Sequence, residues 1–220
     1  MSRPRPLVIF DVDGVLVDTS AANVEGYQAG CRAVGIAVPE PAQVRTLLGL
    51  SFEEMARQLG CPPDRLEAFR GVGGAAYRRH VGEGVPVYPG VPDLLSELSA
   101  GGVRLAAWTT GAVALQEMVL KAVGLRQWIA FLHAHGMTTY PKPDPRGLRE
   151  IVAHFPESAP RFLVDDRGEN LLAGREINAL EVFAAYGFGA PPGSPPHAVV
   201  HTPGEILDLV DPQEPEERRS

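Results

Sequence analysis

The chain has 220 residues, 45% of them hydrophobic, which is enough for one large domain or for a core with a smaller insertion. Its formal net charge is -7 and the acids and bases are interspersed, which argues against a nucleic-acid partner because phosphate backbones attract clustered Lys and Arg. Two cysteines are too few for a disulfide framework, and the longest early apolar run, residues 7–10, is too short for a signal segment or a membrane span, so we expect a cytoplasmic protein that does not bind membranes.

Short apolar runs rich in β-branched residues recur along the chain, as is typical of strands buried on both faces of a parallel sheet. We expect strands at residues 7–10, 103–108, 129–132, 161–164, 181–184 and 198–200. Helical patterns lie between them, at residues 91–100, 112–123, 146–154, 168–178 and 203–209. Strands that alternate with helices predict an α/β fold built on a doubly wound parallel sheet with right-handed crossovers.

One long stretch, residues 20–88, breaks this alternation because it has helical periodicity and no convincing strand. Its clearest helices are predicted at residues 21–34, 51–59 and 64–80. Ser51 precedes the second of them as an N-cap, with Glu54 three residues later. The glycine-rich segment 71–74 follows no strand, so it is interpreted as a break or a close packing point in a helix and not as a phosphate-binding loop.

The domain division follows from this pattern. We predict a core formed by residues 1–17 and 90–211 and a helical insertion, or cap, at residues 18–89. The polar tail at residues 212–220 is predicted to be disordered.

Two aspartates, Asp11 and Asp13, follow the first predicted strand directly. Side chains at positions i and i+2 of an extended segment lie on the same side, so both carboxylates can reach one reacting centre. Such a pair can divide the work, one carboxylate as nucleophile and the other as acid, if their environments separate their pKa values. Gly14 then allows a backbone path that other residues avoid. Asp11 and Asp13 are therefore candidate catalytic residues.

Other strand ends carry residues that suit a phosphate site. Thr109, Thr110 and Gly111 end the second predicted strand, where a hydroxyl and successive backbone N–H groups can bind a phosphoryl oxygen, although Thr is also a common helix cap. Lys142 lies between two prolines, which hold it on a stiff loop.

Asp165 and Asp166 follow the fourth predicted strand. Acids at the end of a buried strand are costly unless they are paired or bound to a metal. Mg²⁺ prefers oxygen ligands and usually keeps some of its water, so one or two carboxylates suffice to bind it. The pair is therefore a candidate magnesium site.

The string DVDGVLVDT at residues 11–19 resembles the first signature of the haloacid dehalogenase superfamily, whose phosphatases read D-x-D-G-[TV], and the remaining signatures occur in order. The resemblance implies a Rossmann-like core with a helical cap inserted after the first strand. It also implies that Asp11 attacks phosphorus and that Asp13 protonates the leaving group. Thr109 would then bind phosphoryl oxygens, and Lys142 would hold the nucleophilic carboxylate and offset phosphate charge.

The same resemblance implies a bound Mg²⁺, held by Asp11, the backbone carbonyl of Asp13 and Asp166. The sequence departs twice from the usual G-D-x-x-x-D pattern, with Asp165 at the Gly position and Asn170 at the second acid. Asp165 is therefore a further candidate ligand, as in family members that read D-D at this point.

The overall pattern is similar to that of phosphoglycolate phosphatase relatives, which implies a small phosphorylated metabolite as substrate and a monomer or homodimer. The segment 48–51 is a candidate specificity loop, and His133 and His135 are candidate substrate contacts or plain loop histidines. Three alternatives remain: a mutase of the same family, although mutases place a His where this chain has Asn23; a dehalogenase, although dehalogenases lack an acid at Asp13; and a non-catalytic phosphate-binding regulatory protein.

Overall fold

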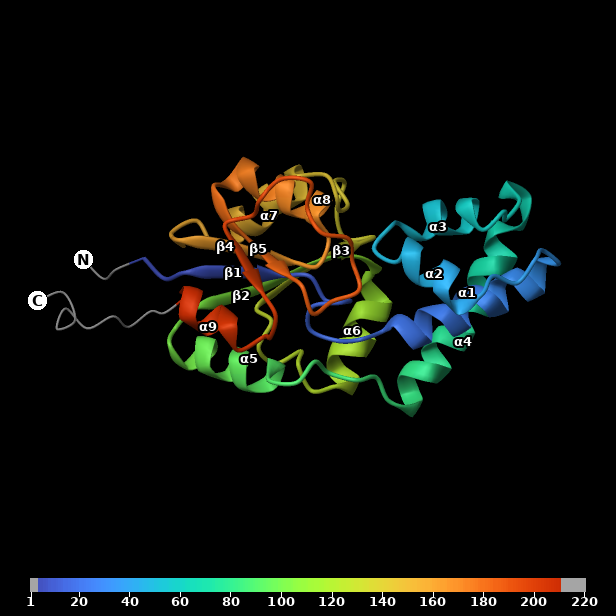
Figure 1. Ribbon diagram of the computed structural model, residues 1–220, viewed down its shortest axis with the longest axis horizontal. Coiled ribbons are helices and arrows are strands. Elements are labelled where there is room, and N and C mark those ends of the chain that lie inside the picture. Colours follow the sequence, from blue (N-terminus) through green and yellow to red (C-terminus); the bar gives the residue numbers. More distant parts are fainter. Residues whose placement is uncertain (1–3, 211–220) are drawn as a thin grey trace, which may run out of the picture.

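The computed structural model describes residues 4–210, which form an α/β core and a lobe of helices (Figure 1). The core is built on six parallel strands in the order β3-β2-β1-β4-β5-β6. The strands are β1 (Leu7–Phe10), β2 (Arg104–Ala112), β3 (Phe131–His135), β4 (Arg161–Asp165), β5 (Ala179–Ala184) and β6 (Ala198–Val200). Strands are added on both sides of β1, so the predicted doubly wound α/β class is confirmed.

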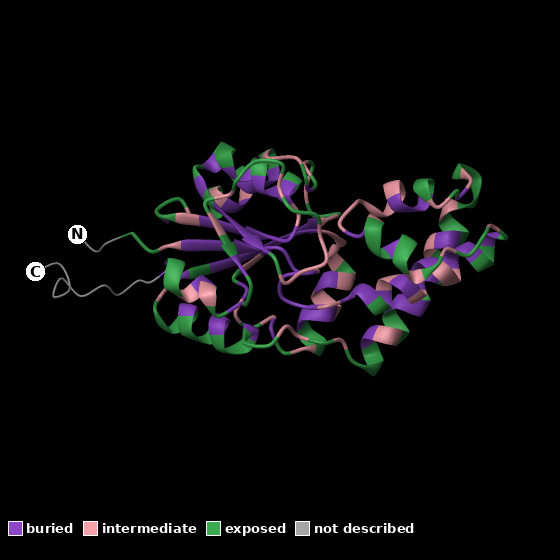
Figure 2. Ribbon diagram, in the orientation of Figure 1, coloured by how far each residue is buried: buried purple, intermediate pink, exposed green. Residues whose placement is uncertain are grey.

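Helices cover both faces of the sheet because successive strand residues point to opposite faces. Val8 and Phe10 of β1 pack in one apolar cluster with α5 (Val91–Ala100), α6 (Val113–Ala122) and α9 (Glu205–Val210). Leu7 and Ile9 pack in a second cluster with α7 (Arg146–His154), α8 (Gly168–Leu171) and the 3₁₀ helix η2 (Leu172–Ile177). The sheet between these layers is buried (Figure 2), as its near-continuous apolar runs require.

Four strands differ in their bounds from the sequence prediction: β4 extends by one residue to Asp165, β5 begins two residues earlier at Ala179, and β2 and β3 differ more. β2 continues past Trp108 to Ala112, and its pairing with β3 is irregular over this extension. β3 begins at Phe131 and not at Ile129, because Ile129 packs in the first apolar cluster from a turn, where its backbone N–H bonds to the carbonyl of Arg126. An apolar residue buried by a turn has the same sequence signature as one buried by a strand.

Most residues between β1 and α5 form helices, as the helical periodicity at residues 20–88 predicted. They are α1 (Ser20–Val34), α2 (Pro41–Leu47), α3 (Phe52–Gln58), the short 3₁₀ helix η1 (Pro63–Arg65) and α4 (Leu66–Glu83). Most of their apolar side chains form a third cluster, whereas Ala22 of α1 and Tyr77 and Val81 of α4 pack in the first cluster on the sheet. Ser51 caps α3 by accepting a hydrogen bond from Glu54 N at 3.3 Å, as expected. The helix α2 was not predicted.

The glycine-rich segment lies inside α4, which continues through it without a break. A Cβ on Gly73 would lie 2.7 Å from the carbonyl oxygen of Gly26 in α1, closer than real Cβ atoms approach. The glycine therefore lets α1 and α4 pack closely, so the close-packing interpretation is confirmed and the break is not.

Two connections join the lobe of helices to the core, and they run side by side. Asp18 N donates to Pro86 O at 2.9 Å, and Tyr88 N donates to Leu16 O at 3.2 Å. The lobe is thus attached through one short paired segment. The domain limits at residues 18 and 89 stay predictions, and the tail at 212–220 lies outside the described residues.

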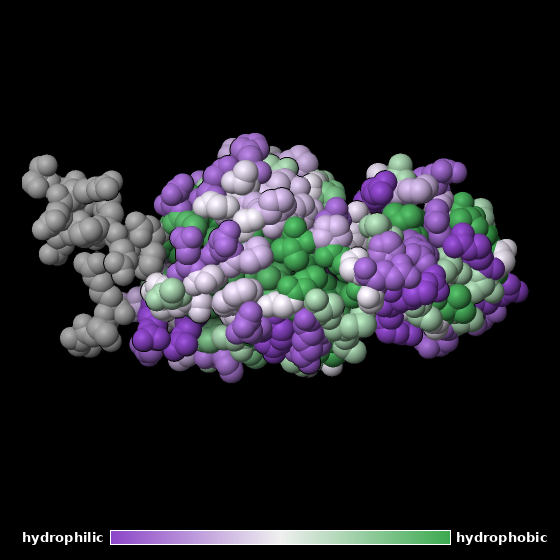
Figure 3. Space-filling view, turned by 90° about the horizontal axis from the view of Figure 1, so that it is seen from below, coloured by the Kyte–Doolittle hydropathy of each residue, from purple (hydrophilic) through white to green (hydrophobic). Residues whose placement is uncertain are grey.

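No helix within residues 4–210 has the length and apolar character needed to cross a membrane. The face shown in Figure 3 carries many hydrophilic side chains around a hydrophobic area near its middle.

Candidate active site

Asp11 lies just beyond the end of β1 and is almost fully buried, with 6% of its surface exposed. Its Oδ1 accepts a hydrogen bond from Val12 N at 2.7 Å, and its Oδ2 lies 2.9 Å from Lys142 Nζ. Lys142 is brought in from the proline-flanked loop after β3, as the sequence suggested for a lysine on a stiff segment. The structure therefore brings together the predicted nucleophile and the predicted lysine.

Lys142 places its positive charge between two of the acidic side chains of the site. Its Nζ also contacts Asp165 Oδ2 at 2.6 Å and donates to Trp108 O at 3.2 Å, at the end of the buried part of β2. Burial opposes the positive charge, but the carboxylates of Asp11 and Asp165 outweigh it and raise the pKa of Lys142 to about 12. The lysine is therefore a fixed cation between two buried acids.

Asp165 has both carboxylate oxygens engaged by the protein. Oδ2 faces Lys142, while Oδ1 accepts from Arg167 N at 2.9 Å and from Asn170 Nδ2 at 3.0 Å. Asn170, which replaces the usual second acid, thus supports Asp165 through its amide. An aspartate with this many donors is held in place whether or not a metal is bound.

Asp166 is held differently, by the backbone of the segment after β5. Its Oδ2 accepts hydrogen bonds from Phe188 N at 3.0 Å and Gly189 N at 2.8 Å. Gly14 lies against it with a φ of 89°, a conformation that L side chains rarely adopt, and a Cβ there would collide with the carboxylate. Burial, with the nearby charge of Asp165, raises the pKa of Asp166 to about 7.

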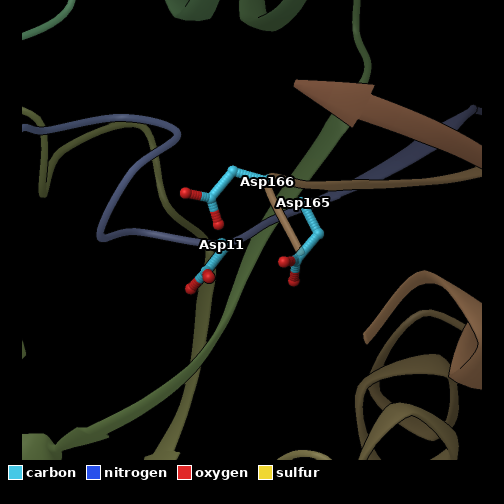
Figure 4. Close-up of side chains that lie close together, drawn as sticks. All are labelled: Asp11, Asp165 and Asp166. Carbon is cyan, nitrogen blue, oxygen red and sulfur yellow. The ribbon is translucent and has the colours of Figure 1, made fainter. Parts of the chain in front are cut away.

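The carboxylates of Asp11, Asp165 and Asp166 converge at the ends of β1 and β4 (Figure 4), and their nearest oxygens lie within 4.8 Å of one another. One lysine against three carboxylates leaves the cluster short of positive charge. Burial raises the pKa of Asp11 well above its usual value even though Lys142 lies beside it, and the neighbouring acids add to the effect. A divalent cation with a preference for oxygen ligands would relieve this, so the donor set fits Mg²⁺.

Asp13 is not part of that cluster. Its Oδ2 accepts from Gln116 Nε2 at 2.6 Å, and its Oδ1 accepts from the Thr19 hydroxyl. Burial raises the pKa of Asp13, while these two hydrogen bonds lower it. The predicted acid/base residue, Asp13, therefore has uncharged hydrogen-bond donors as side-chain partners, whereas the predicted nucleophile, Asp11, contacts the Lys142 cation.

The three candidate phosphate-binding residues of β2 do not all line the pocket. Thr109 is buried, and its Oγ1 accepts a hydrogen bond from Gly111 N at 3.1 Å. Thr110 and Gly111 line a pocket of about 350 Å³ that also contains Asp11 and Asp13. The pocket extends from these aspartates to the wall formed by α1, α3, α4 and the predicted specificity loop at 48–50.

Of the two candidate histidines, one lies at the pocket and the other does not. His135 lines the pocket. His133 is buried within β3, where its Nε2 lies 3.0 Å from Glu150 Oε2. Both belong to the strand and not to a loop.

Sequence reasoning missed several residues of the site. Gln116 reaches Asp13 from α6, 103 residues along the chain, and nothing in its local sequence distinguishes it from an ordinary helix residue. Phe188 and Gly189 act through backbone N–H groups, and the Gly-Phe-Gly string after β5 was the only available signal. Arg167, beside Asp166, donates from Nη1 to the carbonyl of Leu48 in the lobe of helices.

The family model described as haloacid dehalogenase-like hydrolase matches residues 8–183. The chain belongs to the haloacid dehalogenase-like hydrolases. The superfamily resemblance seen in the sequence is therefore confirmed, and with it the prediction of an enzyme of the phosphoric monoester hydrolase class.

Relatives of this hydrolase agree with the assignment. The chain is 27% identical to the probable phosphatase IndB of Dickeya dadantii over 92% of each chain. It is 26% identical to the N-acetylmuramic acid 6-phosphate phosphatase of Pseudomonas aeruginosa, covering 96% of this chain and 97% of the relative. A predicted phosphoglycolate phosphatase from Haemophilus somnus superposes with a TM-score of 0.87 over 94% of this chain and 98% of that one, at 20% identity, which shows the shared fold.

Proposed function

We propose that this hydrolase is a Mg²⁺-dependent phosphatase that cleaves a small phosphate monoester through an aspartyl phosphate on Asp11. The observation that carries the proposal is the separation of two aspartates in one pocket. Asp11 faces the cation of Lys142, whereas Asp13 contacts only neutral donors. With Mg²⁺ beside Lys142, the Asp11 carboxylate would stay ionised, whereas burial raises the pKa of Asp13 and favours its protonated form before the first step.

In the first half of the reaction, a carboxylate oxygen of Asp11 forms a bond to phosphorus as the bond from phosphorus to the alcohol oxygen breaks. Asp13 gives its proton to that departing oxygen. In this proposal Lys142 keeps the attacking carboxylate in place and offsets charge on the phosphoryl group. Thr109, Thr110 and Gly111 would bind the phosphoryl oxygens; Thr110 and Gly111 line the pocket, and Thr109 lies behind them and accepts a hydrogen bond from Gly111 N.

In the second half, Asp13 is ionised and takes a proton from water as the water oxygen bonds to phosphorus. The bond to Asp11 then breaks, inorganic phosphate leaves, and Asp13 holds a proton again for the next cycle. The hydrogen bonds from Thr19 and Gln116 stabilise the ionised form that this half requires.

Asp11, the backbone carbonyl of Asp13 and Asp166 would hold Mg²⁺ in this proposal. When bound, the metal supplies positive charge that offsets charge developing on the phosphoryl oxygens. We assign Asp165 to support of Lys142, because its Oδ2 lies 2.6 Å from Lys142 Nζ, against 2.9 Å for Asp11 Oδ2, and its Oδ1 accepts two hydrogen bonds. Residues 18–89 would act as a cap that closes over the pocket and excludes water.

The test is phosphate release from a panel of monoesters by the purified protein in Mg²⁺. Asp11→Asn should abolish turnover and phosphoenzyme formation, because an amide is not a useful nucleophile. Asp144→Asn is a matched control, since Asp144 lies near Lys142 in sequence but pairs with Arg146. Full turnover by Asp11→Asn would refute the assignment of the nucleophile.

A second assay addresses the rival activities. Asp13→Asn should slow alkyl phosphates more than p-nitrophenyl phosphate, because a nitrophenolate leaves without a proton. Asn23 donates to Thr19 and cannot titrate near neutral pH, which favours a phosphatase over a mutase. Glucose 6-phosphate formed from β-glucose 1-phosphate without phosphate release would point to a mutase. Phosphate binding without turnover would point to a regulatory protein.

A further inference from the structure

The pocket that contains Asp11 and Asp13 is apolar where it enters the lobe of helices. Its wall there is formed by aromatic and aliphatic side chains of α1, the segment 48–50, α3 and α4: Tyr27, Leu48, Leu50, Phe52, Met55 and Phe69. Ala112, Ala114 and Leu115 continue this surface on the core side. The reactive aspartates and this apolar wall belong to one continuous space, so whatever is attached to a phosphate at Asp11 must lie against it.

The charged groups on the wall largely satisfy one another. Arg70 Nη2 lies 2.7 Å from Glu53 Oε1, and the Arg70 guanidinium stacks on the ring of Phe52 at 4.2 Å from its centroid. Within residues 4–210, Arg78 and His135 line the pocket without an ion pair, Arg78 exposed on α4 and His135 half-buried at the end of β3. A second anionic group on the substrate would therefore meet an exposed arginine or a half-buried histidine, and no fully buried cation.

Two amide side chains of the lining already donate hydrogen bonds within the protein. The amide of Asn23 donates to both the carbonyl and the hydroxyl oxygen of Thr19, at 3.1 Å each. Gln116 donates one amide N–H to Asp13, and its Oε1 is buried without a hydrogen-bond partner. Gln116 Oε1 and the hydroxyls of Tyr27 and Thr110 remain for the substrate among the described lining residues, and apolar side chains form most of the wall beside them. A substrate hydroxyl that is buried against that wall without a partner lowers affinity by roughly 5- to 150-fold.

We propose that the alcohol part of the substrate is apolar, a chain or ring of several carbons that lies against Leu50, Phe52 and Leu115. The proposal rests on the phosphatase function proposed above and names its substrate class: phosphate monoesters of primary alkyl or arylalkyl alcohols. The phosphate lies at Asp11 and Lys142, where the site has its buried cation, and the carbon body extends toward α1 and α3. Each methylene that it buries should raise kcat/KM about fourfold.

The experiment compares ethyl, butyl, hexyl and 3-phenylpropyl phosphate with glycerol 1-phosphate, glucose 6-phosphate and phosphoglycolate, in Mg²⁺, with kcat/KM as the readout. The four hydrocarbon esters all release a primary alcohol of similar basicity, so the chemical step is nearly constant and differences report contacts with the wall. We expect kcat/KM to rise from ethyl to hexyl by about fourfold for each buried methylene and to stay high for 3-phenylpropyl phosphate.

Variants locate the effect. Leu50→Asn and Leu115→Asn replace partly exposed pocket residues from the two sides of the pocket, and each should lower the hexyl-to-ethyl ratio of kcat/KM at least about fourfold. Val72→Asn is the control, because Val72 is 48% exposed on α4 and does not line the pocket. Two pocket variants are used, with thermal unfolding of each, so that one misfolded variant does not decide the result.

The outcomes separate the two proposals. A kcat/KM that is flat or falls with chain length, or that is highest for glucose 6-phosphate, overturns the apolar substrate class and leaves the phosphatase intact. A preference for phosphoglycolate that is lost in Arg78→Ala overturns it too, since the exposed arginine would then bind a second anion. No hydrolysis of any ester, p-nitrophenyl phosphate included, overturns both proposals.

Discussion

Gln116→Leu tests whether the amide that reaches Asp13 from α6 takes part in the reaction. Gln116 is buried, and its Nε2 lies 2.6 Å from Asp13 Oδ2, with the N–H donating. A hydrogen bond to a charged group contributes roughly 1.5–3 kcal/mol, which corresponds to about 10- to 150-fold in rate. Leu has a similar size, so the helix should keep its packing while Asp13 keeps only Thr19 as a side-chain donor.

The loss should fall on the second half of the reaction. The amide stabilises ionised Asp13, so removing it raises the pKa of Asp13 and weakens the base that activates water. Dephosphorylation should slow by about 10- to 150-fold, while formation of the aspartyl phosphate from p-nitrophenyl phosphate, which needs no acid, should change little.

Stopped-flow kinetics would show this as a burst of nitrophenolate that approaches one equivalent per site, followed by a slow steady state. Glu117→Gln is the control on the same helix, because Glu117 pairs with Lys121 and Arg126. A steady-state loss in Gln116→Leu without any burst would refute the reasoning, as would wild-type rates.

Three more predictions follow from the geometry. Excess chelator should abolish turnover, and turnover that persists in chelator would contradict the proposed metal dependence. Mg²⁺ at about 100 times its Kd should raise the free energy of unfolding by about 2.7 kcal/mol, measured by thermal or chemical denaturation. Asp165→Asn weakens the contact with Lys142 and should lower kcat/KM about 10- to 150-fold. In a binding titration the Mg²⁺ affinity of Asp165→Asn should fall far less than that of Asp166→Asn, and equal losses of affinity would make Asp165 a ligand. Arg167→Ala removes the bond to the Leu48 carbonyl and should raise KM for a monoester, and an unchanged KM would show that the contact does not affect substrate binding.

The first strand and the residues after it could be predicted because their geometry is local. An apolar run followed by acids at i and i+2 places Asp11 and Asp13 at one sheet edge. The special backbone path at Gly14 could also be predicted, since its φ of 89° is a conformation that favours glycine. The course of β2 could not be predicted, because its pairing with β3 shifts register after Trp108 and resumes at Ala112, opposite His135, and no local pattern encodes such an irregularity.

The division of labour among the acids was also hidden from the sequence. Asp165 and Asp166 are adjacent and chemically identical, yet one faces Lys142 and the other faces backbone N–H groups after β5. Which is which depends on residues 20 or more positions away, whose approach no local pattern encodes.

Arg167 joins two events that otherwise concern different parts of the molecule. It follows Asp166 directly in the chain, and its guanidinium donates a hydrogen bond to the carbonyl oxygen of Leu48 in the lobe of helices. Ion binding at Asp166 and docking of the lobe at Leu48 can be coupled through this residue, and thermodynamic linkage then makes the coupling reciprocal. A tenfold rise in ion affinity on docking requires a tenfold rise in the docking equilibrium constant when the ion binds. Ion titrations on the wild type and on Arg167→Ala would then measure the coupling that depends on this arginine without observing the helices at all.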